Sequence, residues 1–203
     1  LLLEDAPVVW SLSFNADNTI LASIDNYSQV TLWDVATAQP IQSFEQQAEA
    51  IMFHPEKNLL ALGLQNQTVM LWDIEKQQAI ETLRGHAGIL SRLAFSKDGA
   101  FLVSGSFDKT LILWQMDVYP RLAQPLIGHT DSIVAVAYSS DGNTIVTSSY
   151  DGTIRVWDAT SGTPLGEPMT GHTAEVWKVA FSPDGQTLAS GSCAELAPDT
   201  YFC

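Results

Sequence analysis

Residues 128–158 read GHTDSIVAVAYSSDGNTIVTSSYDGTIRVWD, and this stretch decides the fold. An apolar run at 133–138 is followed by Asp141-Gly142 and by a β-branched segment at 144–148. A second turn at Asp151 leads into the segment 154–158, which carries Trp157. Because Asp-Gly between such segments is a strong hairpin signal, the stretch predicts three antiparallel strands. We expect a short outer strand around Leu165 to complete the unit.

The same unit recurs along the chain at a nearly constant spacing. Trp33, Trp72, Trp114 and Trp157 are separated by 39, 42 and 43 residues, and Phe14, Phe53, Phe95, Tyr138 and Phe181 keep the same rhythm. A period of about 40 to 45 residues is typical of a propeller blade of four strands. No segment carries a sustained helical period. The sequence therefore predicts an all-β fold, a β-propeller of four-stranded antiparallel blades.

The number of repeats predicts an incomplete propeller of about four and a half blades within residues 1–193. The full repeats lie near 5–44, 45–83, 84–127 and 128–170, and a partial one occupies 171–193. Residues 194–203 form an atypical tail without the turn Asp or the terminal Trp-Asp. Propellers typically have four to eight blades, so we expect a fragment, a truncated reading frame or a chain that closes by oligomerising. We favour the first two explanations.

Two dipeptides recur in register with these strands. Gly-His stands at 85–86, 128–129 and 171–172, and Trp-Asp at 33–34, 72–73 and 157–158, with Trp114-Gln115 as a variant. In this combination the chain resembles the WD-repeat (WD40) β-propeller family over nearly its whole length. Residues 179–192 are similar to repeats common in its bacterial members.

A His, a Ser or Thr, an Asp and a Trp recur together 43 residues apart. The two sets are His86, Ser104, Asp108 and Trp114, and His129, Thr147, Asp151 and Trp157. The resemblance implies a hydrogen-bonded network in which Asp accepts from His, His meets the hydroxyl, and the hydroxyl meets the indole N–H. An active site needs one constellation rather than a copy in each repeat, so we interpret these residues as structural and expect no catalytic residues.

The network weakens toward both ends of the chain. Around Trp33 the Ser is kept as Ser23, but Tyr27 replaces the Asp; around Trp72, Leu62 and Asn66 take the Ser and Asp places. His54, beside Pro55, is interpreted as a solvated turn residue rather than a ligand.

Composition excludes several classes of partner. The net charge of −14, from 23 acids and 9 bases, disfavours nucleic acid and anionic membranes. No apolar run approaches the ~20 residues needed to cross a bilayer, and the first residues lack the features of a signal peptide. Two cysteines near the end, Cys193 and Cys203, build no disulfide framework or zinc site, which favours a reducing, cytoplasmic setting. We expect no cofactor and no metal.

The leading functional hypothesis is a non-enzymatic scaffold that binds proteins or peptides. Aromatic residues near the Gly-His and Asp turns, Trp10, Phe107, Tyr150 and Trp177, are candidates for a protein-binding rim, or else they pack against neighbouring loops. The alternatives are a propeller enzyme and an inactive truncated remnant. Open blade ends also predict self-association.

Overall fold

The computed structural model describes residues 7–118, 122–192, 194–197 and 200–202. Within these ranges the chain forms strands and turns and no helix. Cys193 and Cys203 lie outside the described residues. None of the described segments is a helix long and apolar enough to cross a membrane.

Three sheets contain four strands each, in chain order and antiparallel. The first is β1 (Val9–Phe14), β2 (Ile20–Asp25), β3 (Gln29–Asp34) and β4 (Gln39–Glu45). The second is β5 (Ala48–Phe53), β6 (Leu59–Leu64), β7 (Thr68–Asp73) and β8 (Gln78–Arg84). The third is β9 (Leu90–Phe95), β10 (Phe101–Ser106), β11 (Leu111–Gln115) and β12 (Leu122–Leu126).

The later sheets have fewer strands. The fourth is β13 (Ile133–Tyr138), β14 (Thr144–Ser149) and β15 (Ile154–Asp158), and the fifth is β16 (Val176–Phe181) and β17 (Leu188–Ser192). β18 (Ala194–Ala197) and β19 (Thr200–Phe202) pair as a separate hairpin.

The outer strand expected around Leu165 is replaced by irregular pairing with β15. Isolated bridges join Trp157 to Pro164 and Ile154 to Met169, and the Leu165 amide donates to the Val156 carbonyl at 2.8 Å. Pro164 has no amide hydrogen to donate, and Gly166 has a φ of +84°, so the segment cannot stay extended.

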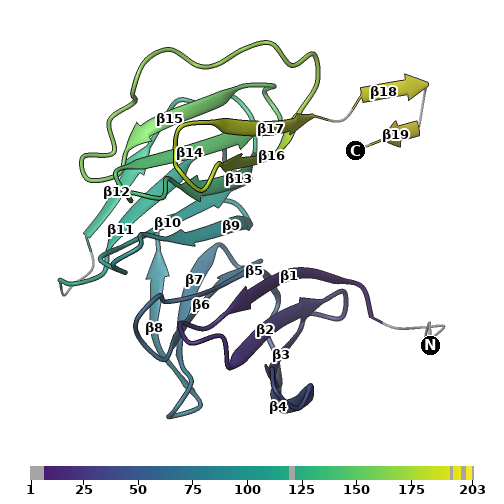
Figure 1. Ribbon diagram of the computed structural model, residues 1–203, viewed down its shortest axis with the longest axis vertical. Helices are drawn as coiled ribbons and strands as arrows, with labels where there is room; N and C mark the ends of the chain where they lie inside the picture. Colours follow the sequence, from purple (N-terminus) through teal and green to yellow (C-terminus); the bar gives the residue numbers. More distant parts are fainter. Residues whose placement is uncertain (1–6, 119–121, 193, 198–199, 203) are drawn as a thin grey trace.

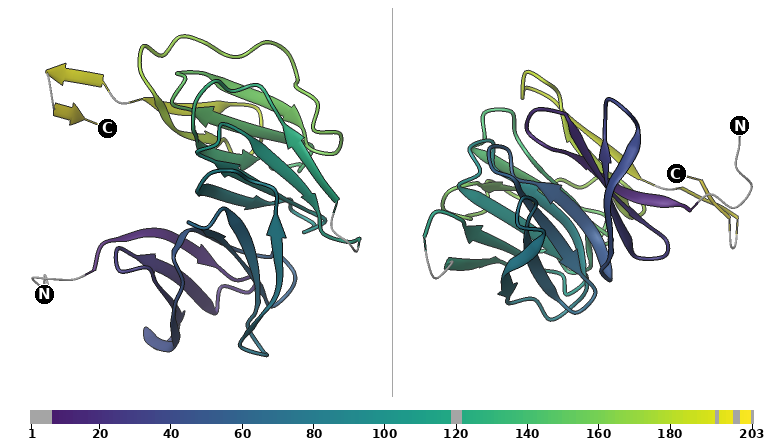
Figure 2. Two further views of the ribbon diagram at one scale, coloured as in Figure 1. Left: turned by 180° about the vertical axis from the view of Figure 1, so that it is seen from behind. Right: turned by 90° about the horizontal axis from the view of Figure 1, so that it is seen from below.

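The sheets follow one another around an arc, with the first and fifth sheets at its ends (Figure 1, Figure 2). The first strand of each sheet lies beside the first strand of the next, from β1 through β5, β9 and β13 to β16. These strands form the inner edge, as in an incomplete β-propeller, and the all-β prediction is confirmed. Side-chain hydroxyls tie neighbouring sheets together here, because Ser13 Oγ accepts from the Phe53 amide at 2.9 Å and Ser91 Oγ donates to the Ile133 carbonyl at 2.6 Å.

The turn between the first two strands of a sheet repeats the same chemistry. In the fourth sheet Asp141 accepts from the Ser139 hydroxyl and the Asn143 amide, and Gly142 takes a φ of +77°. Gly99 holds the same place in the third sheet, with a φ of +68°. Glycine adopts this left-handed conformation without the steric cost that a Cβ brings.

The hydrophobic core is divided into four clusters, each between two adjacent sheets. They join the first sheet to the second, the second to the third, the third to the fourth, and the fourth to the fifth. All six residues of β6 are buried, because a sheet lies on either side of it. In β17, at one end of the arc, none is fully buried.

Candidate functional site

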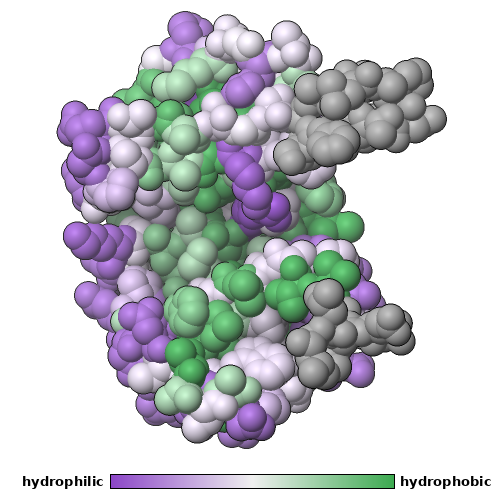
Figure 3. All heavy atoms as spheres, turned by 45° about the vertical axis from the view of Figure 1, so that its right-hand side comes forward, coloured by the Kyte–Doolittle hydropathy of each residue, from purple (hydrophilic) through white to green (hydrophobic). Residues whose placement is uncertain are grey.

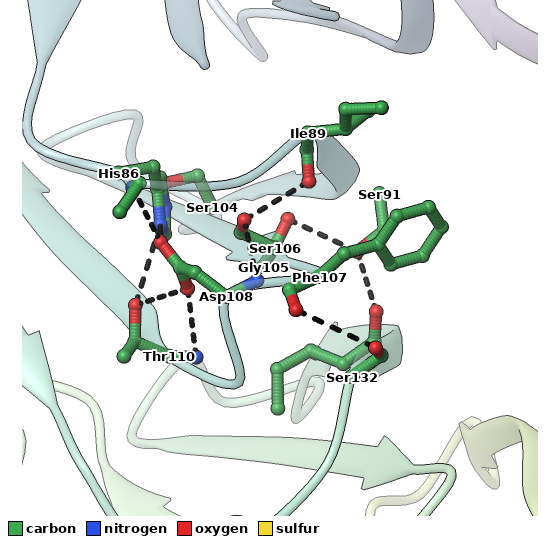
Figure 4. A network of polar contacts seen from close by, with 12 residues as sticks. His86, Ile89, Ser91, Ser104, Gly105, Ser106, Phe107, Asp108, Thr110 and Ser132 are labelled. Atoms are coloured by element: carbon green, nitrogen blue, oxygen red, sulfur yellow. Dashed lines mark hydrogen bonds and ion pairs between the residues drawn. The ribbon is translucent and has the colours of Figure 1, made fainter.

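A series of hydrogen bonds links the entry loop of the third sheet to β10 and to the turn after β10 (Figure 4), and it continues to β11. His86 Nδ1 lies 2.8 Å from Asp108 Oδ2, and His86 Nε2 lies 2.8 Å from Ser104 Oγ. Trp114 Nε1 donates to the same Ser104 oxygen at 2.8 Å. Asp108 also accepts from the Ala87 amide and from the Thr110 amide and hydroxyl. Each polar side chain of this hydrogen-bonded network thus has a partner, which is what buried polar atoms require.

The fourth sheet contains the same arrangement. His129 Nδ1 lies 2.9 Å from Asp151 Oδ2, and His129 Nε2 lies 2.9 Å from Thr147 Oγ1. Trp157 Nε1 donates to Thr147 Oγ1 at 2.9 Å. The structure therefore brings together both sets of residues that the sequence pattern singled out.

Hydrogen bonds keep both carboxylates charged in spite of burial. Burial raises the pKa of Asp108, but hydrogen bonds from His86, Thr110 and the Ala87 amide outweigh it and hold that pKa below its ordinary value. Burial acts in the same direction on Asp151, and hydrogen bonds from Thr153, the Thr130 amide and His129 lower its pKa to about 2.

The His129 ring is neutral at pH 7. Burial lowers its pKa by more than the hydrogen bond to Asp151 raises it. A neutral imidazole has one N–H and one acceptor nitrogen. With Nδ1–H donating to Asp151, Nε2 accepts from the Thr147 hydroxyl, and the hydroxyl oxygen accepts from the Trp157 indole.

A serine, a histidine and an aspartate in this order also match the layout of a hydrolytic triad. Attack on a substrate would need the hydroxyl oxygen to face an open site. Here Ser104 and Thr147 are fully buried, and each hydroxyl accepts from a buried indole. The indole occupies the approach to the oxygen, so the geometry favours a structural role.

The other sheets keep only parts of the arrangement. Trp33 Nε1 donates to Ser23 Oγ at 2.8 Å, and Asp25 caps the turn by accepting from the Tyr27 and Gln29 amides. In the fifth sheet His172 Nε2 lies 2.7 Å from Ser190 Oγ. The sequence reading missed Asp25, although it stands two residues before Tyr27, the replacement for the turn Asp.

Trp72 shows what happens when the hydroxyl is absent. Leu62 fills the Ser place and is fully buried, and Trp72 Nε1 is buried without a hydrogen-bond partner. The ring instead stacks on Phe44, with centroids 4.4 Å apart. Apolar packing here takes the place of the polar link.

The interpretation of His54 as a solvated turn residue is wrong, because only 1% of the residue is exposed. Its Nδ1 accepts from the Glu56 and Lys57 amides, both at 3.1 Å. The ring lies 5.0 Å from the Phe95 ring, and any Cβ at Gly99 would overlap it. Burial lowers the pKa of His54, and Lys57 lowers it further. His54 thus packs under a turn of the next sheet.

The four rim candidates come from the first, third, fourth and fifth sheets. Trp10 is 54% exposed on β1, Phe107 is 45% exposed in the turn after β10, and Trp177 is 36% exposed on β16. The Tyr150 ring lies 4.8 Å from that of Trp177. In the described part of the chain no such ring contact joins Trp10 or Phe107 to another residue.

No described residues form a group of three or more His, Cys, Asp or Glu side chains that could hold a metal ion.

Known proteins share the repeat over part of their length. The chain is 33% identical over 81 residues to the fission-yeast (Schizosaccharomyces pombe) periodic tryptophan protein 2 homolog, covering 39% of this chain and 10% of that protein. It is 34% identical over 88 residues to the rat (Rattus norvegicus) serine-threonine kinase receptor-associated protein, covering 42% and 25%. It is 31% identical over 144 residues to the human (Homo sapiens) WD repeat and SOCS box-containing protein 1, covering 58% and 34%.

The chain thus spans at most about a third of the length of these three relatives. All three are eukaryotic, so the likeness of residues 179–192 to bacterial repeats stays a prediction. The WD40 family model, described as WD domain, G-beta repeat, matches residues 77–115, 121–158 and 162–194, together more than half of the chain. The chain therefore belongs to the WD40 family.

Proposed function

We propose that this protein is a non-enzymatic scaffold that binds proteins or peptides. The observation that carries the proposal is the repeated network. Its His, hydroxyl and Asp side chains are the groups that could act in catalysis, and here they hold the turns of the third and fourth sheets in place. Phe107 directly precedes Asp108, and Tyr150 directly precedes Asp151. A turn held by four hydrogen bonds to its carboxylate presents the neighbouring aromatic residue with little loss of entropy on binding.

The binding surface of the proposal is the aromatic rim, defined as Trp10, Phe107, Tyr150 and Trp177. Exposed aromatic side chains are typical anchors of protein interfaces, since each buries a large apolar area with few rotatable bonds. The net charge of −14 makes nucleic acid and anionic membranes unfavourable partners. A cytoplasmic setting and a propeller segment at residues 1–193 belong to the same proposal, and the separate β18–β19 hairpin supports a distinct tail.

Self-association through the first sheet is also part of the proposal. β1 exposes Val9, Leu12 and Phe14 by 44%, 59% and 52%. In the second to fifth sheets the equivalent faces are covered by the preceding sheet, so a free face favours contact with another sheet of the same kind. Light scattering should show association at micromolar concentration that Leu12→Ser weakens, whereas a monomer at all concentrations would contradict this part.

The rim is tested by selecting peptide binders from a displayed library and measuring their affinity for variants. Phe107→Ala and Tyr150→Ala should each weaken binding by about 1 kcal/mol or more where the residue lies in the contact. Ile80→Ala, which shortens an exposed side chain on β8, is the matched control and should leave affinity unchanged. Lower melting temperatures with unchanged affinities would instead identify the rim residues as packing residues.

The absence of catalysis is tested separately. A hydrolase activity of the purified protein that disappears in His129→Ala, with the fold intact by circular dichroism, would contradict the proposal.

A further inference from the structure

One position of the repeat lies at the same level on all five inner strands. It comes three residues before the repeated aromatic and is occupied by Ser11, Ala50, Arg92, Ala135 and Lys178. The strands carry these residues in equivalent register, since each lies three places before the end of its strand. All five line one cavity of about 310 Å³ on the inner edge of the arc.

The cavity is cationic although the protein is strongly acidic. Its described lining residues include Arg92 and Lys178 but no carboxylate. Ala135 stands between the two cations in the order of the sheets, and its small side chain leaves room between them. The open side of the arc is a hollow with much hydrophobic surface and some hydrophilic atoms (Figure 3).

Arg92 and Lys178 line the same cavity, and the charge of Arg92 acts on Lys178. Burial lowers the pKa of Lys178, and the positive charge of Arg92 lowers it further. Burial also lowers the pKa of Arg92, against the opposing effects of Tyr150 and Glu49. Two like charges that line one cavity repel each other, and an anion between them would relieve their repulsion.

Arg92 retains donors for a ligand. Its Nη1 donates to the Ser91 carbonyl at 2.6 Å, and a guanidinium carries five N–H donors in all. Glu49, the carboxylate whose charge raises the pKa of Arg92, directly precedes the lining residue Ala50. It accepts a hydrogen bond from Gln65 Nε2 at 2.7 Å. Two cations and one carboxylate leave the locality with a net charge of about +1, which matches a single carboxylate better than a doubly charged phosphate.

We propose that Arg92 and Lys178 bind the carboxylate of an acidic side chain in a peptide that lies on the inner edge of the arc. The inference rests on the proposed scaffold function and names the chemistry of its partner. Arg92 supplies a fork of two parallel N–H donors, and Lys178 supplies a mobile ammonium.

The test uses acetate as the probe, so it needs no peptide. The five lysines, Lys57, Lys76, Lys97, Lys109 and Lys178, are labelled as ¹³C-dimethyl lysines, which keep their charge, and their NMR signals are followed. Sodium acetate should shift the Lys178 signal saturably, and sodium chloride at the same ionic strength should not. Arg92→Met should weaken acetate binding roughly tenfold or more, because it removes a charge-assisted hydrogen bond. Arg84→Met, which removes the same charge from an exposed position on β8, should leave it unchanged.

Thermal stability provides a second readout. Acetate should raise the melting temperature of the wild type and of Lys97→Met relative to chloride, but not that of Lys178→Met. The proposal is overturned if chloride acts like acetate, if Arg92→Met binds acetate as the wild type does, or if inorganic phosphate binds more tightly than acetate. Each of these results leaves the test of the aromatic rim intact, because that test measures peptide affinity at other residues.

Discussion

Replacing Asp151 with alanine should destabilise the protein far more than the same change at Asp141. Asp151 accepts four hydrogen bonds, from His129 Nδ1, the Thr130 and Thr153 amides and the Thr153 hydroxyl, at 2.7 to 2.9 Å. Only 7% of its side chain is exposed. Asp141 also accepts hydrogen bonds, from Ser139 and Asn143, but it lies on an exposed turn.

The magnitude follows from the pKa and from the donors left behind. Folding lowers the pKa of Asp151 from 3.8 to about 2, and at 1.36 kcal/mol per pKa unit the charged carboxylate contributes roughly 2 kcal/mol at neutral pH. Leaving the His129 and Thr130 N–H groups without an acceptor brings the expected total to roughly 2 to 4 kcal/mol. At about 2 to 4 °C per kcal/mol for a chain of this size, the melting temperature should fall by about 5 to 15 °C.

Thermal melts followed by circular dichroism measure this difference. Asp141→Ala should cost less than about 1 kcal/mol, as a surface turn substitution does, and Asp151→Asn, which keeps one acceptor oxygen, should lie between the two alanine variants. Because the folded pKa of Asp151 is lowered, its contribution is present above pH 3.8 and is lost as the pH falls toward 2. The gap between wild type and Asp151→Ala should therefore shrink over that range. Equal melting temperatures for the two alanine variants at pH 7 would refute the network.

Three further predictions concern the neighbouring sheets. Trp72→Phe should cost about 1 kcal/mol less than Trp114→Phe in urea unfolding, because the Trp72 N–H has no partner whereas Trp114 donates to Ser104; equal costs would contradict this. Gly99→Ala should destabilise more than Gly142→Ala in calorimetry, although both have positive φ, because a Cβ at 99 would overlap His54 while one at 142 meets only Lys97 at 3.9 Å. Adding His54→Ala should remove most of that difference, and no recovery would speak against the overlap. Lowering the pH from 7 to 5 should reduce the free energy of unfolding, because the unfolded chain protonates at the ordinary His pKa of 6.5 before folded His129 does; a His129→Gln variant should show a flatter profile, and an equally steep one would refute the assignment.

The architecture was predictable because the repeated aromatic occurs five times at a nearly constant spacing, and the repeat tryptophan occurs four times. Each occurrence constrains the others, so the period identifies the strands. Alignment of the repeats also showed where the hydrogen-bonded network is incomplete, since Leu62 and Asn66 stand in the places of the usual partners of Trp72. The structure then showed the consequence as a buried indole N–H without an acceptor.

Contacts between sheets were harder to foresee. The burial of His54 depends on Gly99, 45 residues later in the chain, and on the angle between two sheets, which no local pattern encodes. The placement of Arg92 and Lys178 in one cavity had a signal in the sequence, because both stand three residues before the repeated aromatic. That signal has meaning only when the inner strands are known to lie side by side.

The division of the hydrophobic core into four clusters makes the protein resemble a one-dimensional lattice. Among the described residues, each hydrophobic cluster joins a sheet only to its nearest neighbour. In such a lattice the outermost unit has one stabilising contact and an inner unit has two, so unfolding starts at the ends and travels inward. Amide hydrogen exchange should then form a gradient, fastest in β17 and slowest in β6 and β10. A substitution within the third sheet would interrupt the lattice at its centre and leave two short arrays that melt separately.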